Sequence, residues 1–264
     1  MKILLTGSSG FIGRQFIKFA QDIELIPFDL FLGNDIMDYY KLLTMAQRVD
    51  AVVHLAGATG VPFSNDNPYY YYRYNVEGTM NIARVCSNLK IPLIYASTGD
   101  VKMLNSHYSA SKLASEHVLE VEGKIRGLNY KIIRFLQIYG DGSPENYVIP
   151  IFIRKCRNDE PLTLYGRGLQ KRDFTNVEDI ARIVISFATK KIEGNRLITI
   201  GTGVQTSIIK VAKLIKKLTQ SNSEIIEMEE QRKGEVKELE VDNFYQIPCY
   251  INIIEGIINI LQYE

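Results

Sequence analysis

Three glycines near the start of the chain have the spacing of a phosphate-binding turn. Gly7, Gly10 and Gly13 form a G-x-x-G-x-x-G pattern between an apolar run and a segment of helical period. Glycine allows a tight turn and close approach of a pyrophosphate, and the N–H groups and dipole at the start of a helix favour the anion. We therefore expect a dinucleotide site that also includes Phe11 and Ile12.

Acidic residues downstream of the glycines fit the adenosine half of such a ligand. Asp29 ends the second apolar run about 20 residues further on, where a carboxylate can accept hydrogen bonds from ribose hydroxyls. Leu30 and Phe31 follow it, with no arginine to pair with a 2′-phosphate, so NAD is favoured over NADP. Asp35 and Ile36 are expected to flank the adenine, with the aspartate near its amino group.

A tyrosine and a lysine have the spacing of a proton-transfer pair. Tyr108 and Lys112 lie four residues apart on one face of an expected helix. The lysine and a cationic cofactor would lower the pKa of the phenol, so that Tyr108 takes a proton from a substrate hydroxyl while hydride leaves the carbon. The apolar run before this helix brings Ser97 and Thr98 to the same edge, where Thr98 could orient the reacting oxygen.

These residues need a scaffold of alternating strands and helices, and the sequence has that alternation. We expect an α/β fold with a Rossmann-type, doubly wound parallel sheet. The strands are expected at residues 2–6, 24–28, 51–55, 93–97 and 131–135, and the helices at 11–21, 39–48, 68–89 and 108–126.

The pattern changes after Gly140 and predicts a small C-terminal substrate-binding lobe. We assign residues 1–140 plus about 173–204 to the NAD-binding domain, and about 141–172 plus 205–264 to the lobe. A helix is expected from about Val148, a short strand near Leu162, and an amphipathic helix over 250–263. The lobe would cover the carboxyl ends of the strands, so its residues should set substrate choice.

Composition excludes several classes of protein. The 264 residues carry 31 Lys and Arg against 30 Asp and Glu, a net charge of +1, with no basic stripe for nucleic acid. No segment has the pattern of a secretion signal or a spanning helix, so we expect a cytoplasmic protein without a membrane partner. The three cysteines have no metal-ligand spacing, and no metal is expected.

Taken together, these residues resemble the extended short-chain dehydrogenase/reductase superfamily, in particular its NAD-dependent nucleotide-sugar epimerase/dehydratase family. The resemblance runs from Lys2 to about Asp242. Further segments that carry it are His54-Leu55-Ala56-Gly57, Asn75-Val76-Glu77-Gly78-Thr79, Arg134 through Gly140, Gly166 through Phe174, and Arg232-Lys233-Gly234-Glu235.

The resemblance implies roles for individual residues. Leu55, Ala56 and Gly57 would lie beside the cofactor, and Asn75 would support the active site. Arg172 and Arg232 would hold the diphosphate of the substrate, which suits the planar fork of a guanidinium. The remaining residues expected at the substrate are Thr98, Asp100, Gln137, Asn146 and Tyr147.

The chain departs from the family pattern near the expected pocket. Only ten positions separate Thr98 from Tyr108, far fewer than in most of the family. The loop that normally forms a wall of the sugar pocket is therefore expected to be nearly absent. Gln137 stands where the family usually has an asparagine that touches the substrate phosphates. The expected C-terminal lobe is also minimal. Gly99 precedes Asp100 where a 4,6-dehydratase has two acidic residues, which weakens the dehydratase interpretation.

The leading hypothesis is epimerisation at C4 of a UDP- or dTDP-linked hexose. The first alternative is an NAD(P)H-dependent reductase of a nucleotide 4-keto-6-deoxysugar, which the short segment after Thr98 motivates. The others are a dehydratase and a non-catalytic dinucleotide sensor, although a sensor would not need Thr98, Tyr108 and Lys112. By resemblance, helices 68–89 and 108–126 would pair two protomers in a homodimer.

Overall fold

The chain folds into two compact units. The computed structural model describes residues 1–190, 196–231, 241–248 and 250–263. The first unit contains Met1–Phe135, Ala181–Ile200 and Val241–Tyr245. The second contains Leu136–Ile180, Gly201–Glu240 and Gln246–Glu264.

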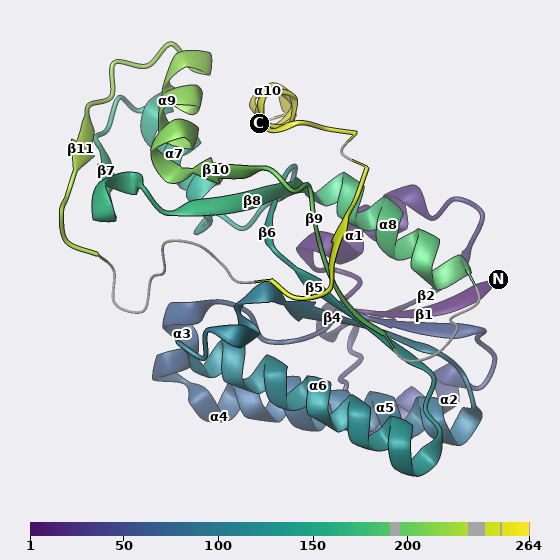
Figure 1. Ribbon diagram of the computed structural model, residues 1–264. Coiled ribbons are helices and arrows are strands. Elements are labelled where there is room, and N and C mark those ends of the chain that lie inside the picture. The colour runs from purple at the N-terminus through teal and green to yellow at the C-terminus, as the bar shows by residue number, and fades with distance from the viewer. Residues whose placement is uncertain (191–195, 232–240, 249, 264) are drawn as a thin grey trace. The chain divides into compact units, whose positions relative to one another are not determined.

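A seven-stranded sheet, counted over the described residues, forms the centre of the first unit, in the order β12-β9-β5-β4-β3-β1-β2 (Figure 1). Neighbouring strands from β2 to β9 are parallel, which confirms the Rossmann-type sheet. The strands are β1 (Lys2–Thr6), β2 (Glu24–Phe28), β3 (Ala51–His54), β4 (Leu93–Thr98), β5 (Tyr130–Phe135), β9 (Arg196–Gly201) and β12 (Phe244–Gln246).

Helices lie on both faces of this sheet (Figure 1). On one face are α1 (Phe11–Phe19) and α8 (Val177–Thr189). On the other are α2 (Tyr39–Ala46), α3 (Val61–Asp66), α4 (Pro68–Tyr71), α5 (Gly78–Leu89) and α6 (His107–Arg126). The single helix expected over 68–89 is instead α4 and α5 joined by a π-helical turn, η2 (Tyr72–Glu77). Short 3-10 turns follow two strands, η1 (Leu30–Leu32) and η3 (Gly99–Lys102).

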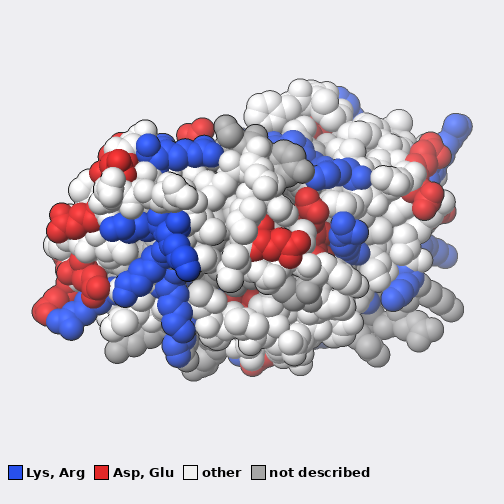
Figure 2. Space-filling view, turned by 90° about the horizontal axis from the view of Figure 1, so that it is seen from above, with Lys and Arg blue, Asp and Glu red and all other residues white. Residues whose placement is uncertain are grey.

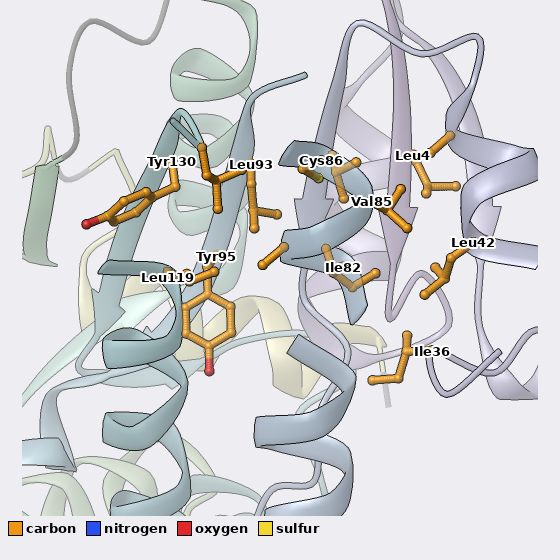
Figure 3. Close-up of a cluster of buried hydrophobic side chains, with 14 of the residues drawn as sticks. Leu4, Ile36, Leu42, Ile82, Val85, Cys86, Leu93, Tyr95, Leu119 and Tyr130 are labelled. Atoms are coloured by element: carbon orange, nitrogen blue, oxygen red, sulfur yellow. The ribbon is translucent and has the colours of Figure 1, made fainter. Parts of the chain in front are cut away.

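The sheet and the helices bury a continuous apolar core. Strands covered on both faces are expected to be apolar throughout, and β3 and β4 are buried along their whole length. Figure 3 shows Ile82, Val85 and Cys86 of α5 packed in the same cluster as Leu4 of β1 and Leu93 of β4. Burial raises the pKa of the Cys86 thiol, which behaves here as a small apolar side chain.

The second unit has its own smaller core. Three strands pair in the order β10 (Gln205–Ser207), β8 (Lys171–Asn176) and β6 (Gln137–Tyr139), and β7 (Leu162–Leu164) pairs in parallel with β11 (Ile225–Glu227). The helices are α7 (Val148–Arg157), α9 (Ile208–Leu218) and α10 (Ile253–Tyr263), and η4 (Tyr165–Gly168) is a short turn. Their apolar faces meet at Phe152, Ile215 and Ile257, which are all buried.

The surface carries both signs of charge. On the face drawn in Figure 2, Lys and Arg side chains are interspersed with Asp and Glu among uncharged residues. Of the helices in the described ranges, none has the length and apolar composition needed to cross a lipid bilayer.

A buried histidine joins β1, β3 and α5. The Nδ1 atom of His54 lies 2.7 Å from Oγ1 of Thr6, and Nε2 lies 3.1 Å from Oγ1 of Thr79. Burial, together with the nearby charge of Lys112, lowers the pKa of His54 to about 3. The imidazole is therefore neutral, with one ring nitrogen donating and the other accepting.

Replacing His54 should make the free energy of unfolding less dependent on pH below neutrality. Because the pKa of His54 in the folded state lies below its unfolded value, the unfolded chain binds more protons below pH 6.5 and stability falls there. The loss between pH 6.5 and 5 is about 2 kcal/mol for this group. In urea unfolding at both pH values, His54→Gln should lack this loss, whereas His107→Gln, at an exposed histidine, should keep it. An unchanged acid slope in His54→Gln would contradict the assignment.

Candidate active site

The glycine turn is as tight as its spacing predicts. Gly7 has a φ of +71°, and a Cβ there would lie 2.6 Å from the amide nitrogen of Ala56. A Cβ on Gly13 would lie 2.1 Å from the carbonyl oxygen of Gly7. Gly10 caps α1 with no side-chain hydrogen bond. The backbone of the turn therefore leaves a space that side chains would fill, next to the N-terminus of α1. This arrangement fits a dinucleotide pyrophosphate.

Other residues expected at the cofactor surround this turn. Phe11 and Ile12 open α1, and Leu55 and Ala56 follow β3; all four are half-buried. The amide of Ala56 donates to Oγ1 of Thr6, over 3.3 Å, which ties the segment after β3 to the end of β1.

Asp29 is fixed beside the glycine turn. Its Oδ2 accepts from the amide of Ser9 and its Oδ1 from the amide of Phe31, both over 3.0 Å. A carboxylate has about four acceptor positions, so Asp29 keeps capacity for the hydroxyls of a ribose. Asp35 accepts from the amide of Met37, and Ile36 is buried against Gly78, where a Cβ would lie 2.4 Å from the Ile36 side chain.

Asn75 lies in the π-helical turn and connects two segments of the site. Its Oδ1 accepts from the amide of Ala58 over 2.7 Å, and its Nδ2 donates to Oγ of Ser111 in α6 over 2.9 Å. A Cβ on Gly57 would lie 2.8 Å from Oδ1 of Asn75 and 4.0 Å from Nζ of Lys112. Gly57, Asn75 and Lys112 are therefore neighbours, and π turns of this kind often occur at functional sites.

Lys112 is buried, with its ammonium directed at β4. Nζ donates to the carbonyl oxygen of Ala96 over 2.5 Å and lies 4.2 Å from the centre of the Tyr95 ring. Burial lowers the pKa of Lys112 to about 7, and the charge of Glu116 opposes that change. A lysine with this pKa can change its charge near neutral pH, as proton-transfer groups do.

Tyr108 lies one helical turn before Lys112, in the first turn of α6. The helix begins with a capping box in which the side chains of Ser106 and Ser109 each accept from the other's amide. The half-buried Tyr108 ring meets Tyr71 edge-on, with centroids 6.3 Å apart. The Tyr71 hydroxyl shares its one proton between the carbonyl oxygens of Thr59 and Gly60. Sequence reasoning missed Tyr71, although the run of tyrosines from 69 to 72 was a visible signal.

Ser97 and Thr98 end β4, as expected. Thr98 accepts from the amide of Asp100, over 3.2 Å, as the cap of η3. The hydroxyl of Ser97 donates to Oε1 of Glu116 over 2.5 Å. Glu116 also forms a buried pair with Arg134, and sequence reasoning missed its place in the site. The signal was an acidic residue four positions after Lys112, on the same helix face.

The described residues that were expected at the diphosphate and nucleotide of the substrate belong to the second unit. Gln137 of β6 and Arg172 of β8 lie on paired strands, where Gln137 is in register with Phe174. Asn146 and Tyr147 lie directly before α7. Arg232 lies outside the described residues.

Asp173, next to Arg172, has a structural role that the sequence did not reveal. It is buried and accepts from the amides of Thr202 and Gly203 and from the Thr202 hydroxyl, over 2.7 to 3.0 Å. These bonds fix the turn after β9 to the start of β8.

Comparisons with known proteins agree with this architecture. The chain is 28% identical to a UDP-glucuronate 4-epimerase of Thermodesulfobacterium geofontis, over 81% of this chain and 80% of the relative. It is also 28% identical to a GDP-6-deoxy-D-talose 4-dehydrogenase of Aggregatibacter actinomycetemcomitans, over 85% and 82%. The crystal structure of a Bacillus cereus UDP-glucuronic acid 4-epimerase, in complex with UDP-glucuronic acid and NAD, has the same fold, with a TM-score of 0.87, 24% identity and coverage of 100% of both chains.

A family model gives the assignment. The model of the NAD dependent epimerase/dehydratase family matches residues 3–201, which include the glycine turn, Asn75, Thr98, Tyr108 and Lys112. The resemblance inferred from these motifs is confirmed. The chain belongs to the NAD dependent epimerase/dehydratase family and is an α/β enzyme whose cofactor is NAD.

Proposed function

We propose that the protein is a C4 epimerase of a UDP- or dTDP-linked hexose. The observation that carries this proposal is the placement of Tyr108 and Lys112 on α6 beside the end of β4, in the same unit as the glycine turn. The family assignment and the 4-epimerase among its relatives support the same reaction.

NAD fits the residues of the first unit. The turn at Gly7, Gly10 and Gly13 would hold its pyrophosphate, and Asp29 its adenosine ribose. Asp35 and Ile36 would flank the adenine. The other residues that we assign to the cofactor are Phe11, Ile12, Leu55, Ala56, Gly57, Asn75, Ser97, Tyr108 and Lys112. NAD supplies a hydride acceptor for C4 of the sugar and a donor that returns hydride to the opposite face.

Tyr108 moves the proton in this proposal. Its phenol oxygen takes the proton of the C4 hydroxyl as hydride leaves, and it gives the proton back when the 4-keto sugar is reduced. The Lys112 ammonium stabilises the phenolate, because an opposite charge nearby favours the ionised form. Thr98 donates a hydrogen bond to the reacting oxygen and keeps it in line with Tyr108.

The substrate is held at its diphosphate, away from the reacting carbon. Arg172 and Arg232 would pair with the phosphate oxygens, and Gln137, Asn146 and Tyr147 would line the nucleotide. Asp100, directly after Gly99, would contact the sugar. A substrate fixed at the diphosphate leaves the hexose able to turn over, which epimerisation requires.

Removing the Tyr108 hydroxyl should abolish turnover. In Tyr108→Phe we expect kcat to fall by roughly 10²–10⁴, since no group then accepts the proton. NAD binding should change little, because the glycine turn and Asp29 remain. Tyr40→Phe, at a tyrosine that is 79% exposed, is the matched control and should behave as wild type. Turnover of a UDP- or dTDP-hexose, followed by separation of the two epimers, is the measurement; full activity in Tyr108→Phe would refute this mechanism.

A nucleotide 4-keto-6-deoxysugar reductase is the second candidate. A relative named as a GDP-6-deoxy-D-talose 4-dehydrogenase favours it. The short segment between Thr98 and Tyr108 is its second support, since less of the pocket wall comes from this loop.

The cofactor content of the purified protein should separate the two candidates. An epimerase recycles its cofactor within one turnover, so NAD should co-purify and be found by absorbance and mass analysis of a small-molecule extract. A protein that purifies empty, and then consumes NADH in the presence of a dTDP- or CDP-4-keto-6-deoxyhexose, would be the reductase instead.

We also propose a cytoplasmic homodimer. The free, buried thiols of Cys86 and Cys156 suit a reducing compartment. Apolar side chains are exposed on the two helices that would pair, where Val121 is 51% and Ile125 65% exposed on α6 and Met80 is 40% exposed on α5. A second protomer packed on these helices would cover them.

Sedimentation should detect the dimer at micromolar concentration. Ile125→Glu should shift it to monomer, because it places a charge in the proposed apolar interface. Ile17→Glu, at an isoleucine of α1 that is 43% exposed, should remain dimeric. A wild-type protein that sediments only as a monomer would argue against the proposal.

A further inference from the structure

Glu116 is a buried carboxylate that the proposed reaction does not yet use. It is 1% exposed and lies on α6, one turn after Lys112 and two turns after Tyr108. Nε of Arg134 donates to its Oε1 over 2.9 Å, and Nη2 donates to its Oε2 over 2.5 Å. This bidentate geometry is the strong form of an arginine–carboxylate pair, and it fixes the carboxylate in one position.

The same carboxylate holds the end of β4. Lys112 donates to the carbonyl oxygen of Ala96, and the next residue, Ser97, donates to Glu116. Two side chains one turn apart on α6 therefore bind consecutive residues of the strand. Thr98 follows directly, so this clamp also sets the position of Thr98 relative to Lys112 and Tyr108.

The charges around Lys112 give Glu116 a further role. Within the described residues, Glu116 is the acidic group whose charge acts on the lysine, and it favours the protonated form. His54 of β3 is neutral, and Tyr95 of β4 presents its ring. Arg134 of β5 is paired with the Glu116 carboxylate, and Tyr108 shares the helix with Lys112.

We propose that Glu116, fixed by Arg134 and Ser97, is the positioning residue that keeps the proton on Lys112, so that Tyr108 is the group of the pair that ionises. This inference rests on the proposed roles of Tyr108 and Lys112. When the pair loses one proton, the proton leaves either the phenol or the ammonium. A carboxylate one turn from the lysine stabilises the ammonium, and the phenol then carries the negative charge that accepts the sugar proton.

Glu116→Gln tests this role with little change of shape. The amide can still accept from Ser97, but the negative charge is gone. In a plot of kcat/KM against pH, we expect the rise on the acid side to move to higher pH by about one unit. At neutral pH kcat/KM should then be roughly tenfold lower than in the wild type, and it should recover at higher pH. Glu122→Gln is the matched control, since Glu122 is a buried glutamate of the same helix, paired with Arg126 and bonded to Ser87. Its pH profile should match wild type.

A titration without substrate tests the same point independently of turnover. Phenolate absorbance, taken as the difference between each protein and its Tyr108→Phe counterpart, reports the ionisation of Tyr108 alone. In Glu116→Gln this titration should shift upward by about the same one pH unit. If the phenolate titration shifts but no nucleotide hexose is turned over, the proposed function fails and the role of Glu116 stands.

Two further variants keep the test decisive. Glu116→Asp retains the charge and should restore most of the wild-type profile. Arg134→Gln leaves the carboxylate and removes its partner, so the acid limb should move to lower pH, and this variant serves if Glu116→Gln does not fold. Three results would overturn the proposal. The first is a loss of activity in Glu116→Gln that is equal at every pH, and the second is a phenolate titration that does not shift in this variant. The third is a pH profile of kcat/KM that moves to higher pH in Arg134→Gln.

Discussion

Polar side chains on the buried face of α6 constrain the whole first unit. A helix that packs against a sheet normally presents apolar residues, but α6 buries Ser111, Lys112, Ser115 and Glu116. Buried polar groups must be hydrogen-bonded, because an unpaired one costs about 1–3 kcal/mol. Each of these residues therefore bonds to a particular partner in β4, β5 or the π turn, and those bonds fix where the helix sits.

The sequence alone predicted those features whose structure depends on residues that are close together in the chain. The strands carry continuous apolar runs, so β1 and β2 were predicted at their observed bounds. The glycine turn could be inferred because the residue type itself reports the backbone geometry, as Gly7 shows with its φ of +71°. Tyr108 and Lys112 could be paired because helical spacing alone puts them on one face.

The rest of the site depends on contacts between distant segments. Nothing near Glu116 in sequence indicates that Arg134, eighteen residues on, would pair with it. Asp173 was noted only as part of a segment that resembles the family, beside Arg172, and its carboxylate binds the turn at Thr202 and Gly203. Likewise, the π turn within the helix expected over 68–89 was not predicted, and a side chain distant in sequence contacts it there, since Ser115 of α6 donates to the carbonyl oxygen of Asn75 over 2.8 Å.

The π turn between α4 and α5 changes which way each half of that helix faces. A π turn contains one residue more than an α-helical turn, and each residue rotates a helix by about 100°. Side chains before and after Asn75 are therefore out of phase, and the two halves can serve different neighbours. Tyr71, before the turn, meets the ring of Tyr108, whereas Ile82 and Cys86, after it, pack into the core of the sheet. One extra residue thus lets a continuous helical segment contribute to the proposed active site at one end and to the hydrophobic core at the other.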